Sequence, residues 1–171
     1  MIQTTRLILR PITFEDAPGM FEMDSSAAVH RYLGQQPVKQ MEEIIEVIGF
    51  IHQQYQDHGM ARWAVIDKQT QEFLGWSGLK WITEPINEKL HYYDLGYRFK
   101  ESAWGKGYAT EAAQAWVNYA RDEMQLDAIF AIADPNNTGS CKVLQKTGFT
   151  QGEIFNWIDE PHLWFSNNFK Q

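Results

Sequence analysis

The residues of this chain best suited to bind an anion are Gly105, Lys106 and Gly107, where a strand-like segment meets a helix-like one. Glycine adopts positive φ angles and has no Cβ to keep a ligand away from the backbone. The first N–H groups of a helix lack intrahelical partners and lie at the positive end of the helix dipole. A phosphate group binds well in such a place, although a plain tight turn would need the same two glycines.

The composition indicates an ordered, globular protein. The chain has 171 residues, of which 44% are hydrophobic and 14% aromatic, enough to bury a core within one domain spanning residues 1–171. No apolar run approaches the ~18 residues that a membrane span needs. The first residues, MIQTTRLILRPIT, lack the apolar block of a signal peptide. We therefore expect a cytoplasmic protein with no membrane partner.

The formal net charge of −7 bears on the partners that the protein can attract. A negative surface disfavours nucleic acid, which binds proteins through phosphate neutralisation by Lys and Arg. It favours the approach of cations such as amines or basic peptides, as a long-range bias. A phosphorylated ligand would need locally arranged donors, which the glycine loop could supply.

Metal and thiol chemistry have little support in the sequence. Cys141 is the only cysteine, which excludes an intramolecular disulfide and a cysteine-based zinc site. Its proximity in sequence to other candidate residues is better explained by packing. The histidines show no metal-ligand spacing, and we expect no metal; they are His30, His52, His58, His91 and His162.

Helices are predicted where apolar residues recur at three- and four-residue steps. The two clearest predicted helices extend from Val38 to His58 and from Gly107 through Ala120. Gly59 suits the C′ position of the first. A shorter helix is expected over Thr138–Thr147. Near the start, Thr13 looks like an N-cap with Asp16 three residues on, and Pro18 would keep that helix short.

Strands are predicted where apolar residues alternate or cluster between turn signals. The expected strands are Thr5–Arg10, Met60–Asp67, Glu72–Ile82, Leu90–Phe99, Ala128–Ala133 and one or two after Phe149. The middle three suggest an antiparallel meander, and Gly75 and Gly78 mark a bulge or a close backbone approach. The nearly all-apolar Ala128–Ala133 is expected to be covered on both faces. The order of these elements predicts an α+β domain around a mixed sheet.

Four segments of the chain resemble the GNAT family of N-acetyltransferases, in particular the branch that includes the bacterial ribosomal-protein N-terminal acetyltransferases. They are TTRLILRPITFED at 4–16, YDLGYRF at 93–99, WGKGYATEA at 104–112 and NTGSCKVLQKTGF at 137–149. The resemblance implies a single-domain GNAT-like fold, with a splayed, mixed and mostly antiparallel sheet flanked by helices. It also implies acetyl-CoA as co-substrate and a primary amine as acceptor.

The resemblance places the pyrophosphate of acetyl-CoA on the glycine loop. Where the family usually has Gln or Arg at the first loop position, this chain has Ser102. This departure matters little, because main-chain N–H groups make most of the contacts to the pyrophosphate. Lys106 either adds charge to this contact or is a solvated lysine, and Glu111 is taken as structural. The implied loop contacts are Ser102, Ala103, Trp104, Gly105, Lys106, Gly107, Tyr108, Ala109 and Thr110.

The pantetheine arm is expected to pair with the backbone of Leu95, Gly96 and Tyr97, as the family's matching strand does. Asn137 matches an Asn that contacts the same arm, although its position suits a helix cap equally well. Lys142 would approach the adenosine phosphates, with a solvated helix face as the alternative.

Acetyl transfer to an amine needs a base for the amine and an acid for the leaving thiolate. Many members of the family have a Tyr as the acid, but here that position is Leu144. The ribosomal-protein branch lacks this Tyr too and has a Ser where this chain has Ser140. We therefore expect Ser140 to protonate the sulfur, the alternative being a helix-start residue that satisfies backbone groups.

Asp94 is the leading candidate for the base, because the family often has a carboxylate at this place near the acceptor amine. The alternative is a strand residue that pairs with Arg98 or Lys89. Asp159 or Glu160 could instead hold or deprotonate the acceptor.

Three questions stay open at the level of sequence. The acceptor is either a protein N-terminus or a small-molecule amine, and homodimer formation is undetermined. A catalytically silent domain that binds acyl-CoA as a sensor or interaction module is the alternative function. A nucleotide-binding P-loop is disfavoured, because no Gly-rich run precedes Gly–Lys–Ser/Thr.

Overall fold

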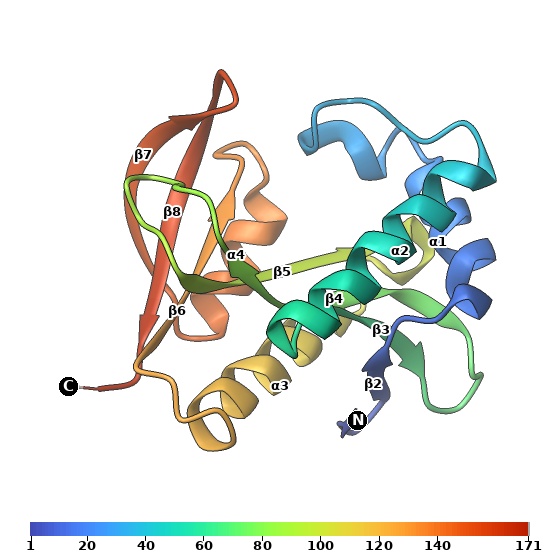
Figure 1. The fold of residues 1–171 in the computed structure, drawn as a ribbon, viewed down its shortest axis with the longest axis horizontal. Coiled ribbons are helices and arrows are strands. Elements are labelled where there is room, and N and C mark those ends of the chain that lie inside the picture. Colours follow the sequence, from blue (N-terminus) through green and yellow to red (C-terminus); the bar gives the residue numbers. More distant parts are fainter. Residues whose placement is uncertain (171) are drawn as a thin grey trace.

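One sheet of eight strands organises the chain in the computed structural model, which describes residues 1–170. The strands lie side by side in the order β1-β2-β3-β4-β5-β6-β8-β7 (Figure 1). Their bounds are β1 Ile2–Gln3, β2 Leu7–Pro11, β3 Arg62–Asp67, β4 Phe73–Ile82, β5 Tyr92–Phe99, β6 Ala128–Ala133, β7 Thr150–Trp157 and β8 Glu160–Asn168.

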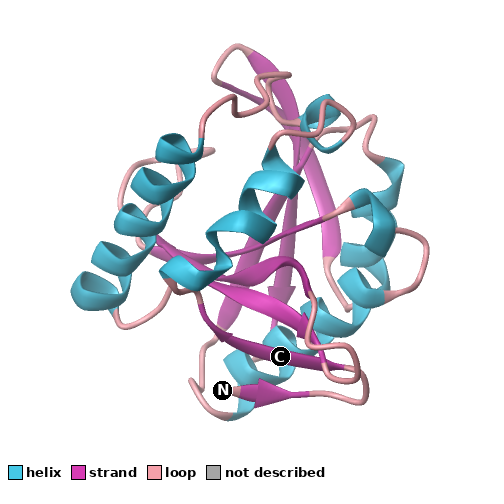
Figure 2. Cartoon of the chain, turned by 90° about the vertical axis from the view of Figure 1, so that its right-hand side faces the viewer, coloured by secondary structure: helices cyan, strands magenta, loops and turns pink. Residues whose placement is uncertain are grey.

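Helices lie on both sides of the strands (Figure 2). The α-helices are α1 Ala17–Asp24, α2 Met41–His58, α3 Tyr108–Asp122 and α4 Thr138–Lys146; the 3₁₀ turns are η1 Phe14–Asp16, η2 Val29–Tyr32 and η3 Glu101–Ala103. Buried residues of α1 and α2 share one apolar cluster with Ala64 and Ile66 of β3. Those of α3 and α4 share another with Leu95 and Phe99 of β5. The two helix pairs therefore cover opposite faces of the sheet.

The sheet opens between β5 and β6. All other neighbouring strands are antiparallel, and β4 and β5 register over eight pairs from Gly75–Phe99 to Ile82–Tyr92. The parallel strands β5 and β6 register only at Asp94 and Phe130. Figure 1 shows β5 running toward α1 and α2, whereas β6 and β8 turn away from it. The mixed, mostly antiparallel and splayed sheet expected from the resemblance is confirmed.

Hydrogen bonding alternates along β5, and this alternation decides which of its peptide groups face the opening. Lys100 N–H donates to the Leu74 carbonyl at 2.9 Å. Because bonding alternates along an antiparallel pair, the even-numbered residues of β5 direct their peptide groups to β4. The odd-numbered residues Leu95 and Tyr97 therefore direct theirs toward β6, beyond the last registered pair.

Most predicted elements are confirmed with shifted ends. α2 begins at Met41 rather than Val38, because Gln40 is extended and forms a capping box with Glu43. Pro18 lies in the first turn of α1, where no N–H is needed. The expected burial of Ala128–Ala133 on both faces is wrong: β6 alternates between half-buried and buried residues. Its buried residues face α3 and α4, whereas Phe130 and Ile132 on the other face pack only against a small aromatic cluster. The two-residue β1 was not predicted.

The meander and its glycines are as expected. β3, β4 and β5 pair in sequence order, and a Cβ on Gly75 would lie 2.1 Å from the Arg98 carbonyl oxygen. Gly75 is thus a point of close backbone approach. Among residues 1–170, no helix combines the length and the apolar character needed to cross a membrane.

Candidate active site

The glycine loop has the backbone that its sequence predicted. Gly105 and Gly107 have φ angles of 72° and 81°, and Gly107 is the N-cap of α3. A Cβ on Gly105 would meet no atom within 4 Å, so the glycine is required by its backbone angle and not by neighbouring side chains. The loop is exposed at both glycines and at Lys106. The N–H groups that begin α3 are thus accessible to an anion.

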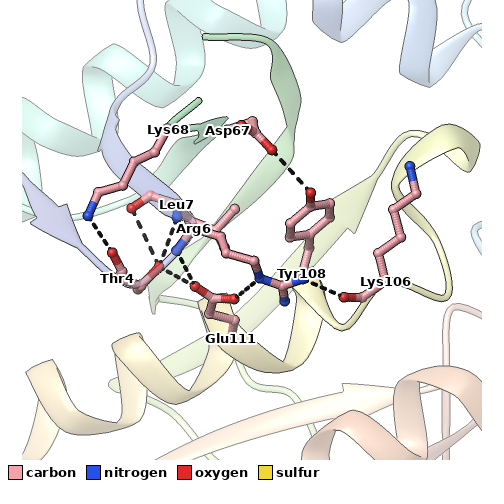
Figure 3. Close-up of polar contacts among 8 residues, drawn as sticks. All are labelled: Thr4, Arg6, Leu7, Asp67, Lys68, Lys106, Tyr108 and Glu111. Carbon is pink, nitrogen blue, oxygen red and sulfur yellow. Dashed lines mark hydrogen bonds and ion pairs between the residues drawn. The ribbon is translucent and has the colours of Figure 1, made fainter. Parts of the chain in front are cut away.

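The loop is attached to the rest of the protein through Arg6, which lies between β1 and β2 (Figure 3). The Arg6 Nη1 donates to the Lys106 carbonyl at 2.9 Å, and its Nε donates to Glu111 Oε2 at 2.7 Å. Glu111 also accepts from the Thr4 hydroxyl at 2.6 Å and from the Arg6 main-chain N–H at 2.8 Å. The expected structural role of Glu111 is supported by these contacts.

Burial alone would raise the pKa of Glu111, but the hydrogen bonds from Thr4 and Arg6 outweigh it, and the pKa is lowered. Glu111 is therefore ionised at neutral pH and holds both residues. Sequence reasoning missed Arg6 and Thr4, because no spacing rule links residues 105 positions apart.

Two aromatic residues complete the packing around the loop. The Arg6 guanidinium lies over the Tyr108 ring, with 4.5 Å between Arg6 Cζ and the ring centroid. The Tyr108 hydroxyl donates to Asp67 Oδ2 at 3.1 Å. Trp104 donates its indole N–H to the Phe99 carbonyl at 2.9 Å. The loop is therefore held to β3 and to the end of β5, as well as to Arg6.

Leu95 and Tyr97 border the opening of the sheet, with Gly96 between them. The Leu95 N–H belongs to the parallel pair at Asp94 and Phe130. The Leu95 carbonyl and the peptide groups of Tyr97 face the gap and can pair with amides of an extended ligand, as an added strand would. Gly96 has a different role in packing: a Cβ there would lie 2.6 Å from Arg62 Nη2.

Ser140 and Asn137 meet at the start of α4. Asn137 is the N-cap, and its Oδ1 accepts from the Ser140 main-chain N–H at 3.1 Å. The helix-cap interpretation of Asn137 is therefore confirmed for its carbonyl oxygen, which leaves the amide nitrogen for a ligand. The Ser140 hydroxyl lies 3.0 Å from the Tyr97 hydroxyl, which also donates to the Ser140 carbonyl at 3.0 Å.

Tyr97 keeps its proton at neutral pH. Burial raises the pKa of the phenol above its ordinary value, and the hydrogen bond with Ser140 lowers it only in part. The contact between Tyr97 and Ser140 joins β5 to α4 across the opening. No pattern in the sequence predicted this contact.

Asp94 lies where β5 and β6 separate, and Arg62 of β3 is its ion-pair partner. The expected alternative partners, Arg98 and Lys89, are wrong. Arg98 is four residues along the same strand, a separation of about 13 Å, and it binds Asp24 instead at 2.6 Å. Burial raises the pKa of Asp94 above the usual carboxyl value, although Arg62 opposes this.

The remaining candidates lie on α4, on β8 and in the turn before β8. Glu160 is exposed and lines a cavity of about 490 Å³ together with Arg31, Tyr32 and Asp134. Asp159 and Lys142 are also exposed. Burial raises the pKa of the Cys141 thiol, which suits packing better than nucleophilic chemistry. Within residues 1–170, no cluster of three His, Cys, Asp or Glu side chains could hold a metal ion.

Comparison with known proteins identifies the chain's relatives. The sequence model of the family described as "Acetyltransferase (GNAT) domain" matches residues 6–150. The N-acetyltransferase YoaA of Bacillus subtilis, whose function is uncharacterised, is 30% identical over 149 residues, covering 87% of this chain and 82% of YoaA.

Two solved structures share the fold. RimL, a ribosomal-protein alpha-N-acetyltransferase in complex with coenzyme A, superposes with a TM-score of 0.80 at 18% identity, covering 96% of this chain and 95% of RimL. Spermidine N-acetyltransferase of Vibrio cholerae, in complex with CoA and spermine, has a TM-score of 0.76 at 16% identity and covers 96% of both chains.

The Arg6 contacts predict an effect on coenzyme A affinity. Arg6→Ala removes the donors to Lys106 and Glu111, so we expect the loop to loosen and the Kd for coenzyme A to rise roughly tenfold, the equivalent of one charged hydrogen bond. Isothermal titration calorimetry measures this Kd. Arg121→Ala is the control, since Arg121 forms an exposed pair with Asp122 at the other end of α3. The Kd of this variant for coenzyme A should stay within about twofold of the wild-type value. An unchanged Kd in Arg6→Ala would contradict the role of Arg6.

Proposed function

Because this chain belongs to the GNAT family of acetyltransferases, which use acetyl-CoA, we propose that it acetylates a primary amine by direct attack on the thioester. Asp94 is the proposed base and Ser140 the proposed acid. The proposal is supported above all by the placement of these groups on opposite faces of β5, beside the opening of the sheet.

The two faces follow from the alternation of side chains along a strand. Asp94 and Tyr97 are three residues apart and therefore point to opposite sides. Asp94 meets Arg62, which lies on the face covered by α1 and α2. Tyr97 packs with the cluster of α3 and α4 and reaches Ser140. A thioester between them would have a base on one side and a proton donor on the other.

The proton steps balance as follows. The ammonium group of the acceptor gives one proton to the Asp94 carboxylate, and the free amine attacks the thioester carbon. The new C–N bond forms, the C–S bond breaks, and the nitrogen loses a second proton as the amide forms. The thiolate takes a proton from Ser140, and Tyr97 reprotonates Ser140. The second proton from the nitrogen returns to Tyr97 through water, and Asp94 releases its proton to solvent, so one proton is set free for each amide formed.

Acetyl-CoA would lie along β5 with its pyrophosphate at the start of α3. The accessible N–H groups of the glycine loop suit the phosphates. The Leu95 carbonyl, the peptide groups of Tyr97 and the amide nitrogen of Asn137 suit the amides of pantetheine. Lys106 and Lys142 are exposed cations and could approach phosphates without desolvation.

The acceptor is a primary amine of either class, a protein N-terminus or a small molecule such as a polyamine. The cavity of about 490 Å³ bordered by Asp134 and Glu160 carries carboxylates that would attract an ammonium group. Arg31 in the same cavity would suit an acceptor that also carries a carboxylate. The net charge of −7 favours cationic acceptors of both classes.

A panel assay tests the activity. We expect purified protein with acetyl-CoA to release CoA thiol in the presence of at least one acceptor from a panel of peptides with free N-termini, polyamines and amino acids. Mass spectrometry of the acceptor identifies the product. Thermal stabilisation by CoA with no turnover on any member of the panel would instead favour the silent acyl-CoA-binding module.

Removal of the proposed acid should lower kcat. Ser140→Ala with acetyl-CoA saturating is expected to lose about 10²-fold or more, the usual effect of losing general acid catalysis. Tyr97→Phe should lose less, roughly tenfold, because serine could recover its proton from water. Cys141→Ser is the control and should keep its kcat. If Ser140→Ala keeps most of its turnover, Ser140 is not the acid.

The base should appear in the pH dependence of kcat/KM. A carboxylate accepts a proton only when ionised, so activity that depends on Asp94 falls as the pH drops through its pKa. Burial raises that pKa, which moves this loss to higher pH than for an ordinary Asp. Asp94→Asn should remove this dependence, leaving only the titration of the amine itself. Glu160→Gln should keep it; the opposite result would assign the base to Glu160.

A further inference from the structure

Arg62 reaches across one strand, β4, to meet Asp94. It starts on β3, passes over β4, and donates from Nη1 to the main-chain carbonyl of Asp94 at 2.6 Å and to that of Gly78. Its Nη2 donates to the Asp94 carboxylate. Both side chains are only 14% exposed. One guanidinium therefore binds the main chain and the side chain of the same residue.

Two facing glycines leave room for this arrangement. Gly78 and Gly96 are registered partners on β4 and β5. A Cβ on Gly96 would lie 2.6 Å from Arg62 Nη2, and one on Gly78 would lie 2.8 Å from Arg62 Cα. Trp76 borders the guanidinium, with 5.5 Å between Arg62 Cζ and the ring. Gly96 leaves the space that the guanidinium occupies, whereas Gly78 lets the backbones of β3 and β4 approach closely.

The contact lies at the point where the sheet opens. Asp94 is the one residue of β5 registered with β6, so Arg62 holds the strand where its pairing with β6 ends. The guanidinium holds one carboxylate oxygen, Oδ2, through Nη2 and the main-chain carbonyl of the same residue through Nη1, so the side chain is fixed relative to its own backbone. The Asp94 carboxylate therefore has a defined orientation beside the gap.

The other groups acting on Asp94 lie on β4 and on β5 itself. Lys80 is its registered partner on β4 and favours the carboxylate, as Arg62 does. Burial and the neighbouring Arg62 lower the pKa of Lys80. Tyr92 and Tyr97 are phenols whose raised pKa values keep them neutral. Arg62 is therefore the cation in direct contact with Asp94.

We propose that Arg62 is a positioning residue for acetyl transfer, which holds the Asp94 carboxylate charged and oriented to accept the proton of the amine. This rests on the proposed function, in which Asp94 is the base. Without Arg62, the buried carboxylate loses its nearest cation and takes up a proton at higher pH. Lysine at this position supplies the charge but cannot bind the carboxylate and both carbonyls at once.

The test measures the ionisation of Asp94 directly. Carboxyl ¹³C NMR of protein labelled in its aspartate side chains gives the titration midpoint, and the signal of Asp94 is assigned by its loss in Asp94→Asn. We expect the midpoint to rise by about one pH unit or more in Arg62→Met, which corresponds to a tenfold change in the protonation equilibrium. Arg62→Lys should shift it less.

Arg98→Met is the matched control. Arg98 contacts Trp76 from 5.2 Å and pairs with the buried Asp24, so its removal also breaks a buried ion pair on this face. The midpoint of Asp94 should stay at the wild-type value in this variant. Activity follows the same order: at pH values below the Asp94 midpoint, kcat should be roughly tenfold lower in Arg62→Met than in the wild type, and it should recover toward higher pH as Asp94 ionises.

The possible failures are distinguishable. An unchanged Asp94 midpoint in Arg62→Met overturns the role of Arg62, whatever the activity of Asp94→Asn. If Arg62→Met does not fold, Arg62→Gln, which also removes the cation but keeps an amide donor, decides in the same way. If the midpoint moves but Asp94→Asn keeps the wild-type kcat, Asp94 is not the base, and the Arg62 contact serves only the fold.

Discussion

The separation of β5 from β6 after Asp94 is the constraint on which the rest of the structure depends. Parallel strands would ordinarily continue to pair, because peptide groups left without partners are costly when buried. Here a single registered pair is followed by a gap, bordered by Leu95 and Tyr97. The gap persists because α3 and α4 pack against both halves of the sheet, through Leu95 of β5 and Ile129 of β6 in one cluster.

Helix α3, which packs against both halves of the sheet, also supplies the anion site. α3 begins at the end of the segment that follows β5, so its exposed N–H groups lie where an extended ligand in the gap would emerge. The helix is positioned by apolar packing of Trp116, which is fully buried and meets Trp63 at 5.0 Å. Its first turn is positioned by polar contacts of Glu111. Apolar packing thus positions the helix as a whole, and hydrogen bonding positions its first turn, where the anion site lies.

Sequence reasoning succeeded where the signal is local. The periods of α2 and α3 and the two left-handed glycines of the loop are properties of short segments, and the structure has them. It failed for contacts between distant segments. Arg62 and Asp94 are 32 positions apart, Tyr97 and Ser140 are 43 apart, and Arg6 and Glu111 are 105 apart. No spacing rule covers such pairs, because they depend on strand order and register.

The face of the sheet that carries Asp94 shows how the charges beside the gap are balanced. Trp76 lies between the guanidinium groups of Arg62 and Arg98, at 5.5 and 5.2 Å. Each of these cations has its own buried carboxylate, Asp94 or Asp24. Two half-buried arginines without such partners would repel an approaching ammonium group. Because each arginine is paired with a carboxylate, the two arginines add little to the electrostatic potential beside the gap. The negative charge of the protein as a whole can therefore still attract the amine.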